Sequence, residues 1–196
     1  MFQVRIHGRG GQGVVTAAEV LSVAAFLDGH WSQAFPSFGS ERTGAPVVSY
    51  CRISDTEIRT REPVLAPDAL IIQDPTLVHL AELFFGLGPD TFILVNTARR
   101  FDELGLARQT STLRPGRLLT VPATELAVAH TGRPVPNTVM LGAFAALSHV
   151  VSMEAVSGAI QQRFRGAVAT SNAAAAVAAF NAVASRLEEC AHAPAD

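Results

Sequence analysis

Three glycines near the start of the chain have the spacing of a phosphate-binding loop. The stretch RIHGRGGQGVV, residues 5–15, places Gly8, Gly10 and Gly13 in a GxGxxG pattern between a predicted strand and a predicted helix. In that context the glycine backbone and the N–H groups of the helix N-terminus form a cradle for phosphate. Alternatively, the glycines serve only close packing of helix on strand. The pattern alone leaves both interpretations open.

Two common nucleotide sites each lack a required residue here. A nicotinamide site needs an acid at the end of the second strand to hold the ribose, but that strand runs into FPSFGS and Asp28 lies before it. A Walker A loop needs Lys and Ser or Thr after the last glycine, where this chain has Val14 and Val15. NAD, ATP and GTP are therefore disfavoured as ligands of this loop.

A second unusual stretch, FPSFGSERTGAPVVSYCRIS, covers residues 35–54. Pro36 and Gly39 mark an ordered turn. The guanidinium of Arg42 can bind a phosphate or a carboxylate, and pairing with Glu41 or with a neighbouring subunit is an equally good interpretation. In a doubly wound sheet this loop follows the carboxyl end of the second strand. It would then share one crevice with the glycine loop.

The other chemically capable residues form no recognisable site. Cys51 and Cys190 are far apart and the six histidines lack metal-ligand spacing, so neither catalytic nor metal-binding residues are predicted. His7, beside the glycine loop, is expected to be a packing residue. Asn137 begins an almost entirely apolar helix, where a capping role is favoured over ligand binding.

Length and composition indicate one α/β domain. The chain has 196 residues, 48% of them hydrophobic, enough for a sizeable core. A net charge of −2 disfavours a nucleic-acid partner. The N-terminus has no secretory pattern and no stretch of 18 apolar residues is uninterrupted, which predicts a cytoplasmic protein without a membrane segment. Residues 1–190 are expected to form the domain and 191–196 a disordered tail.

Alternating strand and helix patterns predict the architecture. Residues 2–35 have the pattern of a βαβ unit, and residues 45–54 with 57–60 that of an antiparallel edge hairpin. The fold class is therefore α/β, with a doubly wound, mostly parallel sheet, an antiparallel edge hairpin and helices on both faces. Continuous apolar runs suit strands covered on both faces, expected at 69–74, 92–96 and 118–122. Helices are expected at 11–27, 75–85, 123–130, 137–151, 152–164 and 171–191.

Several blocks, in matching order, carry a resemblance to a known family. They are GRGGQGVVTAAEVL, QAFPSFGSERTGAPVVSYCRIS, IIQDPTLV, ILVN and PNTVMLGAFAAL. Over residues 2–165 the chain resembles the gamma subunit of the 2-oxoacid:acceptor oxidoreductases, the pyruvate:ferredoxin oxidoreductase family. The resemblance implies a Rossmann-like domain in a complex that converts a 2-oxoacid to its acyl-CoA. The FPSFGSERTGAP block is more similar to the pyruvate, branched-chain and phenylglyoxylate types than to the 2-oxoglutarate or aryl-pyruvate types.

The resemblance also implies a division of labour. Thiamine diphosphate, Mg and 4Fe-4S clusters would lie on partner subunits, namely the thiamine-binding alpha and beta subunits and a ferredoxin-like cluster subunit. Ferredoxin or an NAD-reducing subunit would accept the electrons. This chain alone would bind none of those groups and would help to hold coenzyme A and to assemble the complex. The competing hypothesis is a free-standing nucleotide-binding dehydrogenase, which the missing acid disfavours.

The candidate coenzyme-binding residues come from the two loops and from the helix that begins at Asn137, whose counterpart in the family lies near the crevice. Whether the glycine loop contacts coenzyme A or a partner subunit stays open. The candidate set is Gly8, Arg9, Gly10, Gly11, Gln12, Gly13, Ser37, Phe38, Glu41, Arg42 and Asn137.

Overall fold

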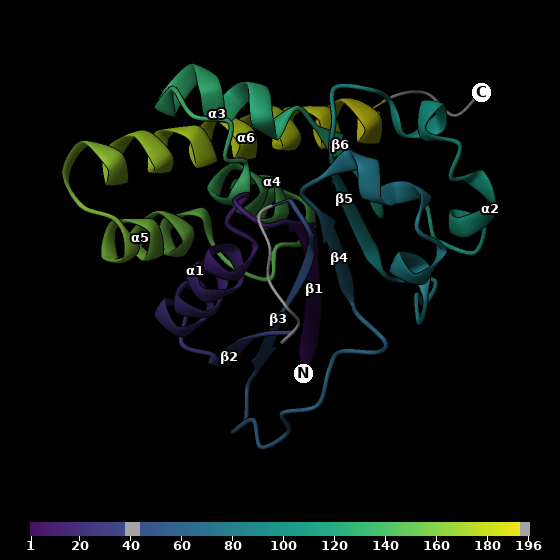
Figure 1. Cartoon of the computed structure of the whole chain (residues 1–196), viewed down its shortest axis with the longest axis horizontal. Helices are drawn as coiled ribbons and strands as arrows, with labels where there is room; N and C mark the ends of the chain where they lie inside the picture. The colour runs from purple at the N-terminus through teal and green to yellow at the C-terminus, as the bar shows by residue number, and fades with distance from the viewer. Residues whose placement is uncertain (38–43, 193–196) are drawn as a thin grey trace.

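A six-stranded sheet lies at the centre of the molecule (Figure 1). The structure is a computed structural model that describes residues 1–37 and 44–192, with side chains to residue 189. In the order β2-β3-β1-β4-β5-β6, strand β3 is antiparallel to both of its neighbours and the remaining pairs are parallel. The strands are β1 (Phe2–Arg9), β2 (Trp31–Pro36), β3 (Pro46–Ser54), β4 (Ala69–Ile72), β5 (Phe92–Asn96) and β6 (Leu118–Val121).

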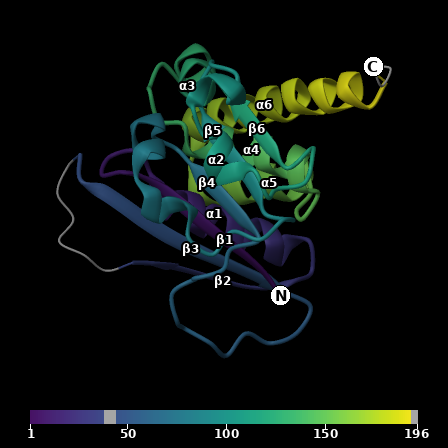
Figure 2. The ribbon, with the colours of Figure 1, turned by 90° about the vertical axis from the view of Figure 1, so that its right-hand side faces the viewer.

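Helices of two kinds cover the two faces of this sheet. The larger layer consists of α1 (Val14–Leu27), α3 (Ala123–Thr131), α4 (Asn137–Ser148), α5 (Met153–Arg163) and α6 (Gly166–His192). Figure 2 shows α6 projecting from the top of this layer towards the C-terminus. The opposite face carries η1 (Pro75–His79), η2 (Ala81–Phe84), η3 (Phe101–Leu104) and the single turn α2 (Ala107–Thr110).

Alternate side chains of the central strands enter two separate apolar clusters, as the two-residue period of a strand requires. The cluster beneath the long helices includes Ile6, Leu21, Ile71, Leu94 and Phe144. The cluster beneath the short helices includes Leu70, Ile72, Leu77, Ile93 and Leu106. The predicted α/β class, with a mostly parallel sheet covered on both faces, is thereby confirmed.

Two details of the predicted topology are wrong. β3 lies between β1 and β2, so residues 2–35 do not form a βαβ unit of adjacent strands. The antiparallel hairpin is β2–β3, and residues 57–60 are not a strand. The guanidinium of Arg52 on β3 instead donates hydrogen bonds to the carbonyl oxygens of Thr60 and Glu62, which holds this segment beside β3. Since β3 already has a partner on each side, no edge remains for a further strand.

Two helices also differ from their predicted extents. The segment expected as one helix at 75–85 is divided at Leu80, whose backbone is extended, into η1 and η2. The last helix begins earlier than residue 171, at Gly166, and reaches His192. The rest of the predicted tail, 193–196, lies outside the described residues.

The packing of α4 on α6 depends on a glycine. α6 has no charged residue from Gly166 to Ser185 and is long and apolar enough to span a membrane by length and composition alone. Here Ala175, Ala176 and Ala179 are buried in the core. A Cβ on Gly142 of α4 would lie 2.0 Å from the carbonyl oxygen of Ala176, so the two backbones approach closely.

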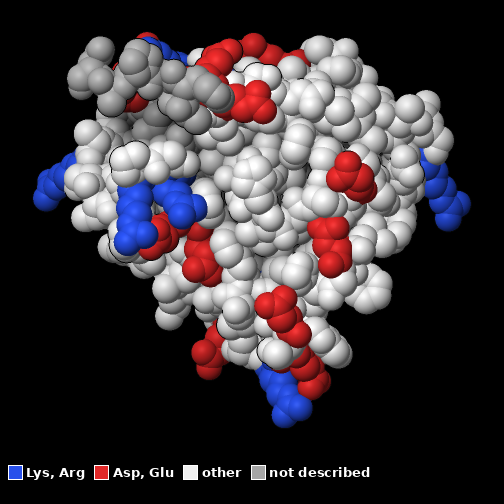
Figure 3. Space-filling view, turned by 180° about the vertical axis from the view of Figure 1, so that it is seen from behind, with Lys and Arg blue, Asp and Glu red and all other residues white. Residues whose placement is uncertain are grey.

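Figure 3 shows a broad uncharged area on the back of the molecule, with charged side chains dispersed around it.

Gly142→Ala is expected to lower the free energy of unfolding by about 1–3 kcal/mol, because the added methyl group overlaps the backbone of α6. Gly158→Ala is the matched control within α5, since its Cβ would meet only the end of the Leu27 side chain, at 3.1 Å. Alanine there gains up to about 1 kcal/mol of helix propensity. Urea unfolding followed by circular dichroism measures both variants, and equal stabilities would contradict the close-packing argument.

Candidate functional site

The glycine loop, residues 9–13, turns the chain from β1 into α1. Gly13 is the N-cap of α1 with φ +71°, and a Cβ there would lie 2.4 Å from Nδ2 of Asn137. A Cβ on Gly8 would lie 2.6 Å from Cγ2 of Val14. Both positions therefore need glycine for packing inside the chain, which supports the packing interpretation for these two residues.

Gly11 is different, because no described atom outside Gly11 and its two chain neighbours lies within 4 Å of the position its Cβ would take, and its φ is +98°. The first backbone N–H of α1 with an intrahelical acceptor belongs to Ala17, which donates to the Gly13 carbonyl at 2.8 Å. The N–H groups of Val14, Val15 and Thr16 precede it and have no acceptor among the described residues. The start of α1 thus presents unpaired donors next to an open, sterically permissive backbone.

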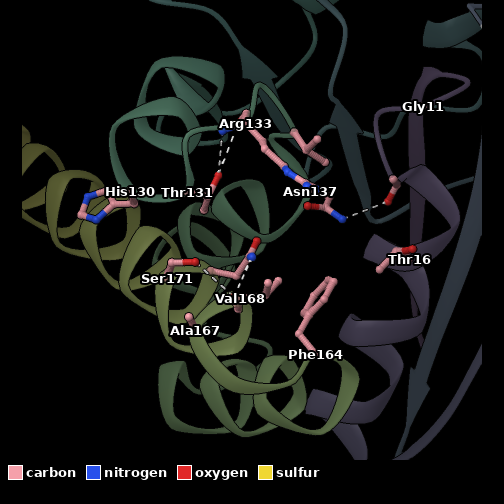
Figure 4. Close-up of a pocket in the computed structure, with 13 residues that line it drawn as sticks. Gly11, Thr16, His130, Thr131, Arg133, Asn137, Phe164, Ala167, Val168 and Ser171 are labelled. Atoms are coloured by element: carbon pink, nitrogen blue, oxygen red, sulfur yellow. Dashed lines mark hydrogen bonds between the residues drawn. The ribbon is translucent and has the colours of Figure 1, made fainter.

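A pocket of about 570 Å³ opens beside this loop (Figure 4). The ring of Phe164 points into it from the junction of α5 and α6. The N-terminal ends of α1, α4 and α6 meet at its wall, together with the C-terminal end of α3. The lining residues are Gly11, Gly13, Thr16, His130, Thr131, Arg133, Val135, Asn137, Phe164, Ala167, Val168, Ser171 and Asn172.

The charges around the pocket favour an anion. Each helix N-terminus carries a partial positive charge of roughly half an elementary charge, and the C-terminal ends of α3 and α5 at the same wall carry the opposite partial charge, so the three N-termini leave a small positive excess. The exposed Arg133 adds a full positive charge, and the described lining contains neither Asp nor Glu. Val135, Phe164 and Val168 supply apolar wall. The arrangement suits a ligand that combines an anionic group with an apolar part.

Asn137 joins the helix ends that form this wall. Its buried side chain accepts a hydrogen bond from the N–H of Thr138 at 2.8 Å, and its Nδ2 donates to the Gly13 carbonyl at 3.5 Å. Thr138 Oγ1 donates to Oδ1 of Asn172 at 2.9 Å, whose Nδ2 donates to the carbonyl of Val168 at 2.8 Å. One polar chain therefore links α1, α4 and α6. The predicted capping role is wrong, because Pro136 is the N-cap of α4 and no described side chain caps that helix. Asn137 instead combines its contacts between helix ends with a place on the pocket wall.

Arg9 and Gln12, both in the predicted site, are engaged by a residue that sequence analysis did not identify. Nε2 of Gln12 donates to Oδ2 of Asp74 at 2.8 Å, and Nε of Arg9 lies 3.3 Å from the same oxygen. Asp74 directly precedes η1 and caps it by accepting the N–H of Thr76. An Asp before Pro after a buried strand is a recognisable cap signal, but nothing local points to its contacts with the glycine loop.

Only the two ends of the loop after β2 are described, at Ser37 and from Gly44 onwards. Ser37 is exposed at its start, and Gly44 at its end donates its N–H to the Gly10 carbonyl at 3.2 Å. The Gly10 N–H in turn donates to the Ala45 carbonyl at 2.9 Å. This end of the loop therefore lies beside the glycine loop, as predicted. The described residues exclude three members of the candidate set: Phe38, Glu41 and Arg42.

His7 lies beneath the glycine loop on β1. Burial, with a smaller contribution from the positive charge of Arg5, lowers the pKa of His7 to about 3. Its Nε2 has no hydrogen-bond partner among the described residues. The imidazole is therefore neutral near pH 7, in keeping with a packing role. In the part of the chain that is described, no three His, Cys, Asp or Glu side chains are grouped to hold a metal ion.

Comparison with known proteins assigns the family. The family model described as pyruvate ferredoxin/flavodoxin oxidoreductase matches residues 3–182. The chain belongs to this family. Pyruvate synthase subunit PorC of Methanothermobacter marburgensis is 45% identical over 180 residues, which cover 92% of this chain and 96% of the relative. The common gamma subunit of the pyruvate/ketoisovalerate oxidoreductases of Thermococcus kodakarensis is 42% identical over 181 residues, with the same coverage of both chains.

Solved structures agree with this family assignment. Pyruvate oxidoreductase subunit PORC of Thermotoga maritima has a TM-score of 0.79 at 34% identity, covering 92% of this chain and 95% of that one. The 2-oxoglutarate:ferredoxin oxidoreductase of Magnetococcus marinus has a TM-score of 0.70 at 18% identity, covering 94% of this chain and 31% of that one, which shows a shared fold. The resemblance to gamma subunits of pyruvate ferredoxin oxidoreductases is confirmed: this is a subunit of an enzyme complex. A free-standing dehydrogenase is not favoured.

The low pKa of His7 predicts a pH dependence of stability. Between about pH 6.5 and about pH 3 the unfolded chain binds a proton at His7 that the folded chain does not bind. The free energy of unfolding should therefore decrease as the pH falls through this window, by about 1.4 kcal/mol per pH unit from this group. His7→Gln should remove that part of the slope, while His79→Gln, at an exposed position, should keep it. Urea unfolding across the window measures both, and an unchanged slope in the His7 variant would show that the folded chain accommodates the proton.

Proposed function

We propose that this chain is the gamma subunit of a thiamine-diphosphate-dependent, iron–sulfur 2-oxoacid:acceptor oxidoreductase complex in the cytoplasm. The complex would oxidatively decarboxylate a 2-oxoacid to its acyl-CoA. The names of the relatives, pyruvate synthase and pyruvate/ketoisovalerate oxidoreductase, support pyruvate or a branched-chain oxoacid as substrate. Within the complex this chain would assist coenzyme A binding and assembly.

The redox groups are assigned to the partners. Cys51, the one cysteine whose side chain is described, is buried, and the described residues offer no metal-ligand group, so this part of the chain does not fit a cluster or a metal site. Thiamine diphosphate, Mg and the 4Fe-4S clusters would lie on the alpha, beta and ferredoxin-like subunits. Ferredoxin or an NAD-reducing subunit would take the electrons.

The main support for the coenzyme part is the convergence of three helix N-termini on one pocket. Coenzyme A carries a diphosphate, a phosphate and a long uncharged arm with methyl and methylene groups between its amides, which suit unpaired N–H donors, a guanidinium and a wall with apolar side chains. In this proposal Gly11 lets a phosphate approach the start of α1, and Arg133 pairs with a phosphate oxygen. Asn137 holds the N-terminal end of α4 against the start of α1 through its hydrogen bond to the Gly13 carbonyl. When bound, coenzyme A supplies the thiol that accepts the acyl group.

Arg133→Ala should raise the apparent KM for coenzyme A in the assembled complex by about ten- to a hundredfold, because a charge-assisted contact to phosphate is lost. Oxoacid-dependent reduction in a single turnover without coenzyme A should stay near the wild-type rate, because the coenzyme is needed only afterwards. Arg59→Ala is the control, at an exposed arginine paired with Glu57. An intact complex with an unchanged coenzyme A requirement would contradict the pocket assignment.

Arg42→Ala is the parallel test of the guanidinium that sequence analysis selected in the second loop. The same rise in KM would assign it to coenzyme A as well. Dissociation of the complex would assign it to a subunit interface, and no effect would leave its pairing with Glu41 as the better account.

The isolated chain should catalyse no oxoacid oxidation, show no visible cluster absorbance and bind NAD only weakly. Purification of the untagged complex, followed by identification of its subunits and bound cofactors, should recover the alpha, beta and cluster-bearing partners. Robust turnover by the purified single chain would contradict the proposed role as a subunit.

A further inference from the structure

One carboxylate joins the segments that surround the glycine loop. Asp74 lies between β4 and η1, with 11% of its side chain exposed. Its Oδ1 accepts hydrogen bonds from the N–H and Oγ1 of Thr76, at 2.9 and 2.5 Å. Its Oδ2 accepts from Nε2 of Gln12 at 2.8 Å and lies 3.3 Å from Nε of Arg9. Every one of these partners is a donor, so the position requires an acceptor on both oxygens.

The side chain of Gln12 connects Asp74 to the backbone of the glycine loop. While its Nε2 donates to Asp74, its Oε1 accepts the backbone N–H of Arg9 at 2.8 Å. A carboxamide has one donor side and one acceptor side, so both contacts are satisfied in this orientation only. A Cβ on Gly8 would lie 2.9 Å from the same Oε1, which shows how closely the amide is packed.

The side chain of Arg9 extends the network to the second loop. Its Nη1 donates to the Gly44 carbonyl at 3.1 Å, and its Nε and Nη2 donate to Oγ1 of Thr76 at 3.2 and 2.8 Å. Gly44 is also hydrogen-bonded to Gly10 through the backbone. The Asp74 network therefore holds the glycine loop and the end of the second loop together. The guanidinium of Arg9 has its hydrogen-bond partners within this network, and Arg9 does not line the pocket of about 570 Å³.

The carboxylate is charged in this setting. Burial raises the pKa of Asp74, but the hydrogen bonds from Thr76 and Gln12 and the charge of Arg9 outweigh it, so the pKa lies below the ordinary value for Asp. Near pH 7 the network therefore consists of an anionic acceptor surrounded by three donor side chains.

We propose that Asp74 is a positioning residue, which holds the glycine loop in the shape that exposes the start of α1 to the pocket and keeps Arg9 out of it. The consequence for coenzyme A rests on the proposed function, whereas the consequence for the loop does not. Arg133, and not Arg9, is then the arginine that meets the ligand's anionic group.

A reciprocal exchange of carboxylate and carboxamide tests this geometry. Asp74→Asn retains the size of the side chain but places an NH₂ group against the donors of Gln12 and Arg9. Turning the Gln12 amide around moves the mismatch to the backbone N–H of Arg9. Adding Gln12→Glu restores donor–acceptor pairs at both ends of the side chain at position 12, since the new carboxylate accepts from the amide at position 74 and from the backbone N–H of Arg9. The net charge is again that of the wild type. The contact of position 74 with Nε of Arg9 is not restored, but this guanidinium keeps its hydrogen bonds to Thr76 and Gly44.

Hydrogen exchange is measured on the full chain, and the KM for coenzyme A on the assembled complex. In Asp74→Asn, hydrogen exchange of the hydrogen-bonded backbone amides of Arg9, Gly10 and Gln12 should accelerate at least about fivefold, because local opening becomes easier. The KM for coenzyme A should rise about tenfold, as expected for loss of well-placed donors, while coenzyme-independent single-turnover reduction stays unchanged. The double variant with Gln12→Glu should restore both quantities. Asp90→Asn is the control. Asp90 lies before β5, is half-exposed and pairs with Arg114, so its substitution should change neither the exchange nor the KM.

The outcomes separate the two proposals. Unchanged exchange in Asp74→Asn, or failure of the double variant to restore it, would overturn the positioning role. Faster exchange with an unchanged KM would support the positioning role and contradict the coenzyme assignment of the pocket. If Asp74→Asn does not fold, the double variant decides: a folded chain with wild-type exchange supports the proposal, and an unfolded one overturns it.

Discussion

The turn from β1 into α1 can be made only with glycine backbone, and the arrangement of the site depends on this constraint. Gly13 has a positive φ, and neither it nor Gly8 has room for a Cβ. Because both residues lack a Cβ, α1 can lie close to the sheet and Asn137 can reach the start of α1. A similar constraint at Gly142 brings α6 close to α4. Three helix N-termini can therefore meet at one pocket, although the helices are far apart in the sequence.

Polar side chains in this molecule mostly hold the backbone, and this explains how irregular segments remain close to the sheet. Arg5 is buried on β1 and donates to the carbonyls of Leu83 and Phe85, as well as to Val64. Arg52 does the same for the segment that follows β3. These guanidinium groups bind carbonyls rather than acids, which satisfies backbone acceptors that no strand or helix would pair. The network of Asp74 applies the same principle at the glycine loop.

The site that results has the features of a binding surface. Its described walls contribute helix-end N–H groups, one exposed guanidinium and apolar side chains, with no carboxylate among them. Such a surface, whose described ionisable side chains are those of Arg133 and His130, stabilises negative charge. This agrees with membership of a family whose relatives are subunits of pyruvate and oxoacid oxidoreductases, and with the proposal that the oxidative chemistry takes place on partner chains.

The sequence by itself determined the features that depend on neighbouring residues. Apolar runs identified β4, β5 and β6, because strands buried on both faces need them. Glycine spacing identified the loop, and the order of the blocks identified the family. Only the tertiary structure decided that β3 lies between β1 and β2, that Asp74 binds Gln12, and that Asn137 reaches Gly13. These contacts join residues dozens of positions apart, and their geometry is set by packing of whole elements, for which no local pattern exists.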